Sequence, residues 1–119
     1  MQVKWSQFQS YIDGNVDEAP TQAGVYLLWT KLAKDEWRIF YVGEADSLRF
    51  KLKQHRSCTG PNKLIRRKIV NCVTGFEYSV QPDPLVRAGV LKFLAQHYRP
   101  ECGSSGVAPE IEPIEVNLP

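Results

Sequence analysis

The sequence predicts an α+β fold, a small three-stranded antiparallel sheet flanked by helices. Two runs rich in strand-forming residues, Gly24–Lys31 and Trp37–Gly43, are separated by a short polar turn, which is typical of a β-hairpin. Beyond the hairpin, apolar residues recur at helical spacing, and a third alternating run stands between helical segments. The expected order is helix, strand, strand, helix, helix, strand and helix.

The first expected helix precedes the hairpin. Ser6 can serve as its N-cap, and Phe8, Tyr11 and Ile12 would lie on one face of it. Asp13-Gly14 is expected to end this helix, and the residues that follow read as a loop up to the first strand.

Three helices and one strand are expected beyond the hairpin. Each is bounded by a polar cap, a glycine or a proline, and they cover residues 47–54 (helix), 62–72 (helix), 75–81 (strand) and 84–98 (helix). Asp46 or Ser47 can cap the first of these helices. Asp83 and Pro84 suit the N-cap and the first helical position of the last one.

The 119 residues are enough for one compact domain with its own core. We expect an N-terminal helix and loop at 1–19, the main domain at 20–102 and an acidic tail at 103–119. The tail contains Glu110, Glu112 and Glu115 without any lysine or arginine, and its Gly, Ser and Pro content is typical of extended or disordered chain. Its short apolar pairs also allow an additional edge strand.

Composition excludes several classes of protein. The first nine residues lack the charged-then-apolar order of a signal peptide, and no apolar run approaches the about 18 residues of a membrane span. We therefore expect a cytoplasmic protein with no membrane partner. Cys58, Cys72 and Cys102 contain no close pair, so reduced thiols are expected rather than a disulfide framework. A zinc site built from them and His55 is an alternative, although the spacing matches no common zinc pattern.

Positive charge is concentrated in one stretch of the chain. No acidic residue lies between Asp46 and Glu77, and this interval holds eight basic residues: Arg49, Lys51, Lys53, Arg56, Lys63, Arg66, Arg67 and Lys68. Such segregation is typical of a surface that neutralises a phosphate backbone. The alternative is a solvated basic face with no partner. We predict that these residues, apart from Lys51, which is discussed below, form a nucleic-acid-binding surface.

Two short motifs resemble the GIY-YIG nuclease superfamily. Gly24-Val25-Tyr26 matches the first signature and Tyr41-Val42-Gly43 matches the second, with Pro20 upstream. The segment after the second signature, up to His55, and the stretch "LAQHYRP" are also similar to the family. The resemblance covers about residues 20 to 103 and implies a GIY-YIG-like domain with a three-stranded antiparallel sheet.

In active members, the resemblance implies one divalent metal, Mg²⁺ or Mn²⁺, held by a glutamate on the last helix. The metal polarises the phosphoryl oxygen, and a basic side chain stabilises the charge that develops on the phosphate. On this chain the implied catalytic residues are Tyr26 and Tyr41 for water activation, Lys51 for the phosphate, and His55 as proton donor or phosphate contact.

The sequence departs from the family pattern at three positions that matter for chemistry. Lys51 stands where an arginine is expected and keeps its charge without the bidentate geometry, and Glu44 stands where a basic residue is usual. Counting back from the end of the last helix places the metal-binding glutamate at Leu91, and no carboxylate lies between Asp83 and Glu101. We therefore assign no metal ligand.

Three functional hypotheses follow. We favour a GIY-YIG-like nucleic-acid-binding domain related to endonucleases, with impaired or altered phosphodiester cleavage and no cofactor, and with DNA favoured over RNA. The second hypothesis is an active, divergent endonuclease that uses Mg²⁺ or Mn²⁺, with Glu44 and Asp46 considered as new ligands. The third is a protein-interaction domain whose tail, at 109–116, binds a protein partner.

Overall fold

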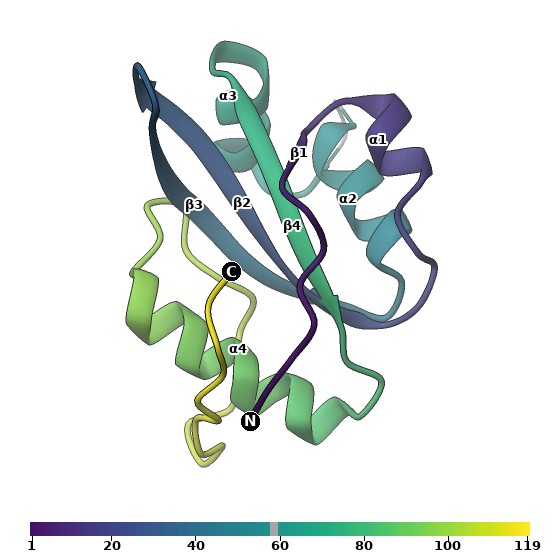
Figure 1. Ribbon diagram of the computed structural model, residues 1–119, viewed down its shortest axis with the longest axis vertical. Coiled ribbons are helices and arrows are strands. Elements are labelled where there is room, and N and C mark those ends of the chain that lie inside the picture. The colour runs from purple at the N-terminus through teal and green to yellow at the C-terminus, as the bar shows by residue number, and fades with distance from the viewer. Residues whose placement is uncertain (58–59) are drawn as a thin grey trace.

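The computed structural model describes residues 1–57 and 60–119. Its elements are β1 (Gln9–Ser10), α1 (Asp13–Asp17), β2 (Gly24–Ala33), β3 (Glu36–Ala45), α2 (Leu48–Arg56), α3 (Lys63–Asn71), β4 (Thr74–Val80) and α4 (Pro84–Tyr98). In the described part of the chain, four strands form one antiparallel sheet in the order β1-β4-β2-β3 (Figure 1). The predicted α+β class is confirmed, but the prediction of three strands is wrong because β1 adds a fourth.

The additional strand comes from the N-terminal segment, for which the sequence predicts a helix between Ser6 and Asp13. The segment is extended instead, and α1 begins at Asp13, where the predicted helix would end. The free edge of β4 explains the difference. The N–H of Ser6 donates to the carbonyl of Tyr78 (2.8 Å), and the N–H of Tyr11 donates to the carbonyl of Thr74 (3.0 Å). Pairing with an open strand edge satisfies backbone groups of both segments, so it overrides the local helical spacing.

Each face of the sheet has its own apolar core. On one face, Tyr26 of β2 packs with Leu48 and Leu52 of α2 in a cluster that also includes residues of α1 and α3. On the other face, Val25 and Leu27 pack against α4 (Figure 1). Successive residues of a strand point to opposite faces, so this arrangement explains why the first half of β2 is apolar at every position.

Two glycines of the hairpin lie where no side chain fits. Gly43 pairs across the strands with Tyr26, and a Cβ at Gly43 would lie 2.7 Å from Cε1 of the Tyr26 ring and closer still to its Cζ and hydroxyl. At Gly24, a Cβ would lie 2.9 Å from Cδ1 of Leu48 and would also collide with the carbonyl oxygen of Ser79. The absence of a side chain at these positions therefore lets the tyrosine ring and α2 approach the sheet.

The C-terminal tail folds back on the domain as extended chain. Just after α4, Ser104 forms a parallel bridge with Val42 on the outer edge of β3. Farther along, Val116 is buried in the core on the α4 side of the sheet. The side chain of Asn117 then accepts a hydrogen bond from the N–H of Val3 (2.7 Å) and donates one to its carbonyl (3.0 Å). The two ends of the chain are thereby held together.

The helix starts follow the caps that the sequence predicts. The hydroxyl of Ser47 accepts from the N–H of Phe50 (3.3 Å), and the carboxylate of Asp83 accepts from the N–H of Leu85 (2.9 Å), with Pro84 as the first residue of α4.

Among the described residues, no helix has the length and apolar character needed to cross a membrane.

Candidate functional site

The two signature tyrosines meet His55 in a pocket on the α2 and α3 side of the sheet. The pocket has a volume of about 470 Å³ and is lined by Tyr26, Tyr41, Lys51, Gln54, His55, Pro61, Asn62, Lys63, Leu64 and Ser105. Strands β2 and β3 form its floor, and helices α2 and α3 contribute its walls. All four residues predicted to be catalytic therefore line one pocket, and their catalytic role stays a prediction.

The strand register explains how the three rings come together. Tyr41 pairs with Leu28, which lies two residues after Tyr26 and therefore on the same face of β2. The centroids of the two phenol rings are 6.1 Å apart. The ring of His55 reaches the pair from the last turn of α2, with its centroid 5.7 Å from that of Tyr26 and 5.4 Å from that of Tyr41.

A short hydrogen bond of 2.6 Å joins the hydroxyl of Tyr26 to Nε2 of His55. Both side chains are buried, and Nδ1 of His55 has no hydrogen-bond partner among the described residues. Burial, with a further contribution from the neighbouring Tyr41 phenol, raises the pKa of Tyr26 well above its usual value. Burial and the Lys51 cation lower the pKa of His55 to about 4. Both groups are therefore neutral near pH 7, so neither brings a charge to the pocket.

The tail brings one residue to the pocket that the sequence analysis missed. The hydroxyl of Ser105 lies 3.4 Å from the hydroxyl of Tyr41 and accepts a hydrogen bond from the N–H of Glu44 (3.1 Å). Ser105 can reach this position because the residue before it bridges to the edge of β3. No local pattern in the sequence indicates this contact, since it depends on how the tail runs beside the strand.

The structure separates the seven predicted nucleic-acid-binding residues into two groups. Three form ion pairs within the protein: Lys53 with Asp17 (2.8 Å), Arg56 with Asp13 (2.8 Å) and Lys68 with Glu101 (3.0 Å). Two donate hydrogen bonds to carbonyls: Arg49 to Ala19 (2.7 Å) and Arg66 to Arg56 (2.6 Å). By contrast, two of the seven, Lys63 and Arg67, have no ion-pair or hydrogen-bond partner for their side chains among the described residues. The same is true of Lys51. Among the eight basic residues of this interval, those whose side chains have no partner among the described residues therefore line the pocket or lie on α3.

The pocket does not fit the divalent metal that the family resemblance implies. Among the described residues, its polar side chains are two phenols, an imidazole, two amides, a hydroxyl and two lysines, and none of them is a carboxylate. Mg²⁺ and Mn²⁺ prefer carboxylate oxygens, and lysine side chains repel a cation. Leu91, where the resemblance places the metal-binding glutamate, is fully buried in the core on the other face of the sheet. In the part of the chain that the structure describes, no group of three or more His, Cys, Asp or Glu side chains could hold a metal ion.

The acidic residues considered as alternative metal ligands face an arginine instead. The Nε of Arg87 lies 3.6 Å from the carboxylate of Glu44, and its terminal nitrogen donates to the carboxylate of Asp46 (3.3 Å). Arg87 is buried near the start of α4 and also donates to the carbonyl of Gln81 (3.0 Å). Its positive charge partly compensates the two carboxylates, and the side chain of Asp46 is in addition fully exposed to solvent.

The zinc alternative also finds no support in the described residues. Cys72 and Cys102 are free, partly buried thiols, and Nε2 of His55 is engaged with Tyr26. Cys58, the remaining member of that alternative, lies outside the described residues.

Comparison with known proteins supports the fold. The chain is similar to the crystal structure of the GIY-YIG N-terminal endonuclease domain of UvrC from Thermotoga maritima, a tyrosine-to-phenylalanine point mutant bound to its catalytic divalent cation. The match has a TM-score of 0.56 and a sequence identity of 20%, and it covers 76% of this chain and 91% of that one. No protein-family model and no curated protein sequence matches this chain. The chain therefore has the GIY-YIG fold, as its two signatures predict.

Proposed function

We propose that this protein is a nucleic-acid-binding domain with the GIY-YIG fold that contacts phosphate groups at the tyrosine pocket without metal-dependent cleavage. The observation that carries the proposal is the charge of the pocket. Lys51 and Lys63 line it without partners among the described residues, and no carboxylate lines it. A site with this balance attracts a phosphodiester and offers no ligand to a hard divalent cation.

Each group in the pocket has a clear role in binding. The two lysines supply positive charge and N–H donors, and the hydroxyl of Tyr41, which lines the same pocket, can donate a further hydrogen bond. Hydrolysis requires more than this, because the transition state gathers negative charge that a metal ion usually stabilises. The neutral Tyr26–His55 pair is held by its own hydrogen bond and contributes shape rather than charge near pH 7.

Binding and cleavage can be measured on the same samples. Labelled DNA would be titrated with the protein at several salt concentrations, and cleavage would be followed in Mg²⁺ and in Mn²⁺. We expect salt-sensitive binding without cleavage. Lys51→Ala and Lys63→Ala should each lower the slope of log affinity against log salt by about 0.7 to 0.9. Lys34→Ala is the matched control, because Lys34 is exposed at the turn between β2 and β3.

Two results would contradict the proposal in different ways. Metal-dependent cleavage that disappears in Tyr26→Phe would make the protein an active, divergent endonuclease and would require a metal site assembled with its substrate. No detectable binding of nucleic acid at low salt would leave the third hypothesis, a protein partner bound through the tail. The same titration with RNA in place of DNA tests the predicted preference for DNA.

A further inference from the structure

We infer that the tyrosine pocket accepts one unpaired nucleotide of a single strand, and that the strand continues across α3 rather than along a duplex. This inference rests on the proposed function and names the substrate class of the same site. It is carried by the concave shape of the pocket, by the placement of the unpartnered cations and by an exposed leucine between two depressions.

The pocket is built to receive a ligand between its walls. Lys51 belongs to α2 and Lys63 is the first residue of α3, and between these two helices the signature tyrosines form a floor that is almost fully buried. A duplex is stiff on this length scale, so its phosphates can touch only the rim of such a pocket. An unpaired nucleotide turns freely about its backbone and can enter. The volume of about 470 Å³ lies within the range of about 300–1,000 Å³ that is usual for small-ligand sites.

A second depression continues the site along α3. It has a volume of about 280 Å³ and is lined by Leu64, Arg67, Lys68, Asn71, Cys72, Glu101 and Cys102. Leu64 lines both depressions, and 53% of its surface is exposed, so its side chain is accessible from either of them. An apolar side chain in this position offers a face on which a base can pack.

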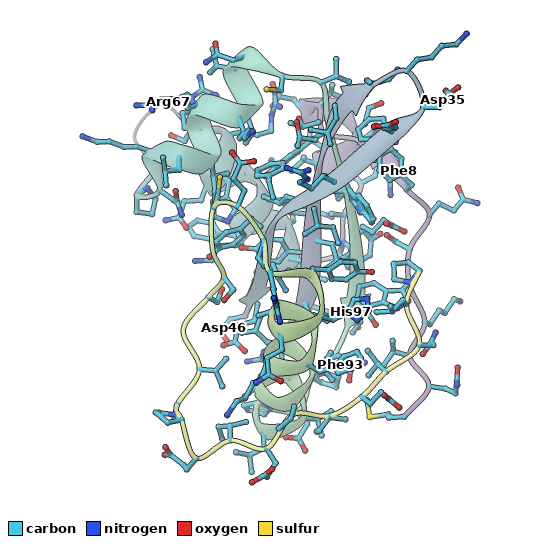
Figure 2. All side chains as sticks on the ribbon, turned by 90° about the vertical axis from the view of Figure 1, so that its left-hand side faces the viewer. Phe8, Asp35, Asp46, Arg67, Phe93 and His97 are labelled. Carbon is cyan, nitrogen blue, oxygen red and sulfur yellow. The ribbon has the colours of Figure 1, made fainter. Side chains whose placement is uncertain are left out.

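The unpartnered cations of α3 follow the same path. Lys63 and Arg67 are four residues apart on the helix, so they lie on one side of it, roughly 6 Å from each other at Cβ. Figure 2 shows Arg67 on the outer side of α3, away from the body of the protein. One phosphate between Lys51 and Lys63 and the next beside Arg67 would place the intervening base over Leu64. Lys68 cannot supply this charge, because it is paired with Glu101.

Competition binding tests this inference with the full chain. A labelled oligothymidylate, the same strand in a blunt duplex, thymidine 5′-monophosphate and thymidine would be compared at one salt concentration. We expect the single strand to bind about tenfold or more tightly than the duplex. The monophosphate should displace the strand, and thymidine, which lacks the phosphate, should not.

Two exposed leucines provide a matched pair of variants. Leu64→Ala should weaken binding of the single strand about tenfold and change duplex binding little, because a base no longer buries the apolar surface of this side chain. Leu32→Ala should have no effect, since Leu32 is similarly exposed, at 49%, but belongs to the hairpin. Equal affinity for the two forms without displacement by the monophosphate, or an ineffective Leu64→Ala, would overturn the inference and leave the proposed function standing. Absence of binding to both forms would overturn the proposed function itself.

Discussion

The glycine of the second signature, Gly43, leaves room for the ring of Tyr26, and replacing it with alanine tests whether the fold requires a glycine there regardless of any catalysis. The added Cβ would lie 2.7 Å from Cε1 of the Tyr26 ring and closer to its Cζ and hydroxyl. The ring is fully buried, and its hydroxyl is bound to His55 at 2.6 Å, so it can move away only by losing that bond and disturbing the core around it.

The expected loss of stability follows from these two consequences. Forcing an extra methyl group into a packed core costs about 1–3 kcal/mol. A buried hydrogen-bonding group left without its partner costs about 1–3 kcal/mol more. The free energy of unfolding should therefore fall by about 2–6 kcal/mol, a large part of the roughly 5–15 kcal/mol that is typical of a domain.

Urea unfolding followed by tryptophan fluorescence measures this loss. Gly14→Ala is the matched control, because nothing lies within 4 Å of a Cβ at Gly14, which is inside α1. That variant should be neutral or more stable by up to about 1 kcal/mol, since alanine is the better helix former. Combining Gly43→Ala with Tyr26→Phe, which already lacks the hydroxyl, should cost less than the sum of the two single changes, by about 1–3 kcal/mol. A Gly43→Ala protein within about 0.5 kcal/mol of wild type would refute the reasoning.

Three further predictions concern buried side chains, one in the pocket and two on α4. The pKa of His55 is about 4 in the folded protein, below the value of about 6.5 that is usual for an unfolded chain. Between these two pH values only the unfolded chain binds the proton, so the free energy of unfolding should fall by about 3 kcal/mol as the pH drops from 6.5 towards 4. In urea unfolding at each pH, His55→Gln should reduce this loss of stability, while the same change at the exposed His97 should leave it unchanged. Arg87→Ala should destabilise the protein by about 2–4 kcal/mol, because it removes a buried side chain together with its hydrogen bonds to the carbonyls of Gln81 and Pro82. Asp46→Ala should cost less than about 1 kcal/mol, because Asp46 is exposed, and thermal unfolding distinguishes the two variants. Leu91→Glu should lower the free energy of unfolding by about 3–5 kcal/mol, because it buries a carboxylate in the core on the other face of the sheet. We expect no Mg²⁺-dependent cleavage from this variant. A stability equal to that of wild type, or new cleavage, would show that this position reaches the pocket.

Local patterns were sufficient for most of the fold. The hairpin, the caps at Ser47 and Asp83, and the order of the main elements all depend on neighbouring residues, which a sequence displays directly. The extra strand at Gln9–Ser10 could not be predicted in this way, because its partner is the free edge of β4, far along the chain. The contact between Ser105 and Tyr41 has the same origin, since a strand edge decides where the tail runs.

The charge pattern was informative about the region and misleading about individual residues. The sequence places eight basic residues in one interval, but it does not reveal that Asp13 and Asp17 of α1 lie against α2. These pairings remove Arg56 and Lys53 from the set of uncompensated cations. The residues of this interval whose side chains have no partner among the described residues are Lys51, Lys63 and Arg67, and they line the pocket or lie on α3.

The signature residues also change meaning once their contacts are known. Gly24 and Gly43 stand where a side chain would collide with the neighbouring chain, and Tyr26 completes the core while its hydroxyl is satisfied by His55. Each of these requirements belongs to folding and would hold in a protein that never cleaves a phosphodiester. The motif therefore identifies the fold without indicating the reaction. The presence of a carboxylate at the site would separate the reaction from the fold. Here a fully buried leucine stands where the metal ligand is expected, and no acidic side chain lines the pocket in the described part of the chain.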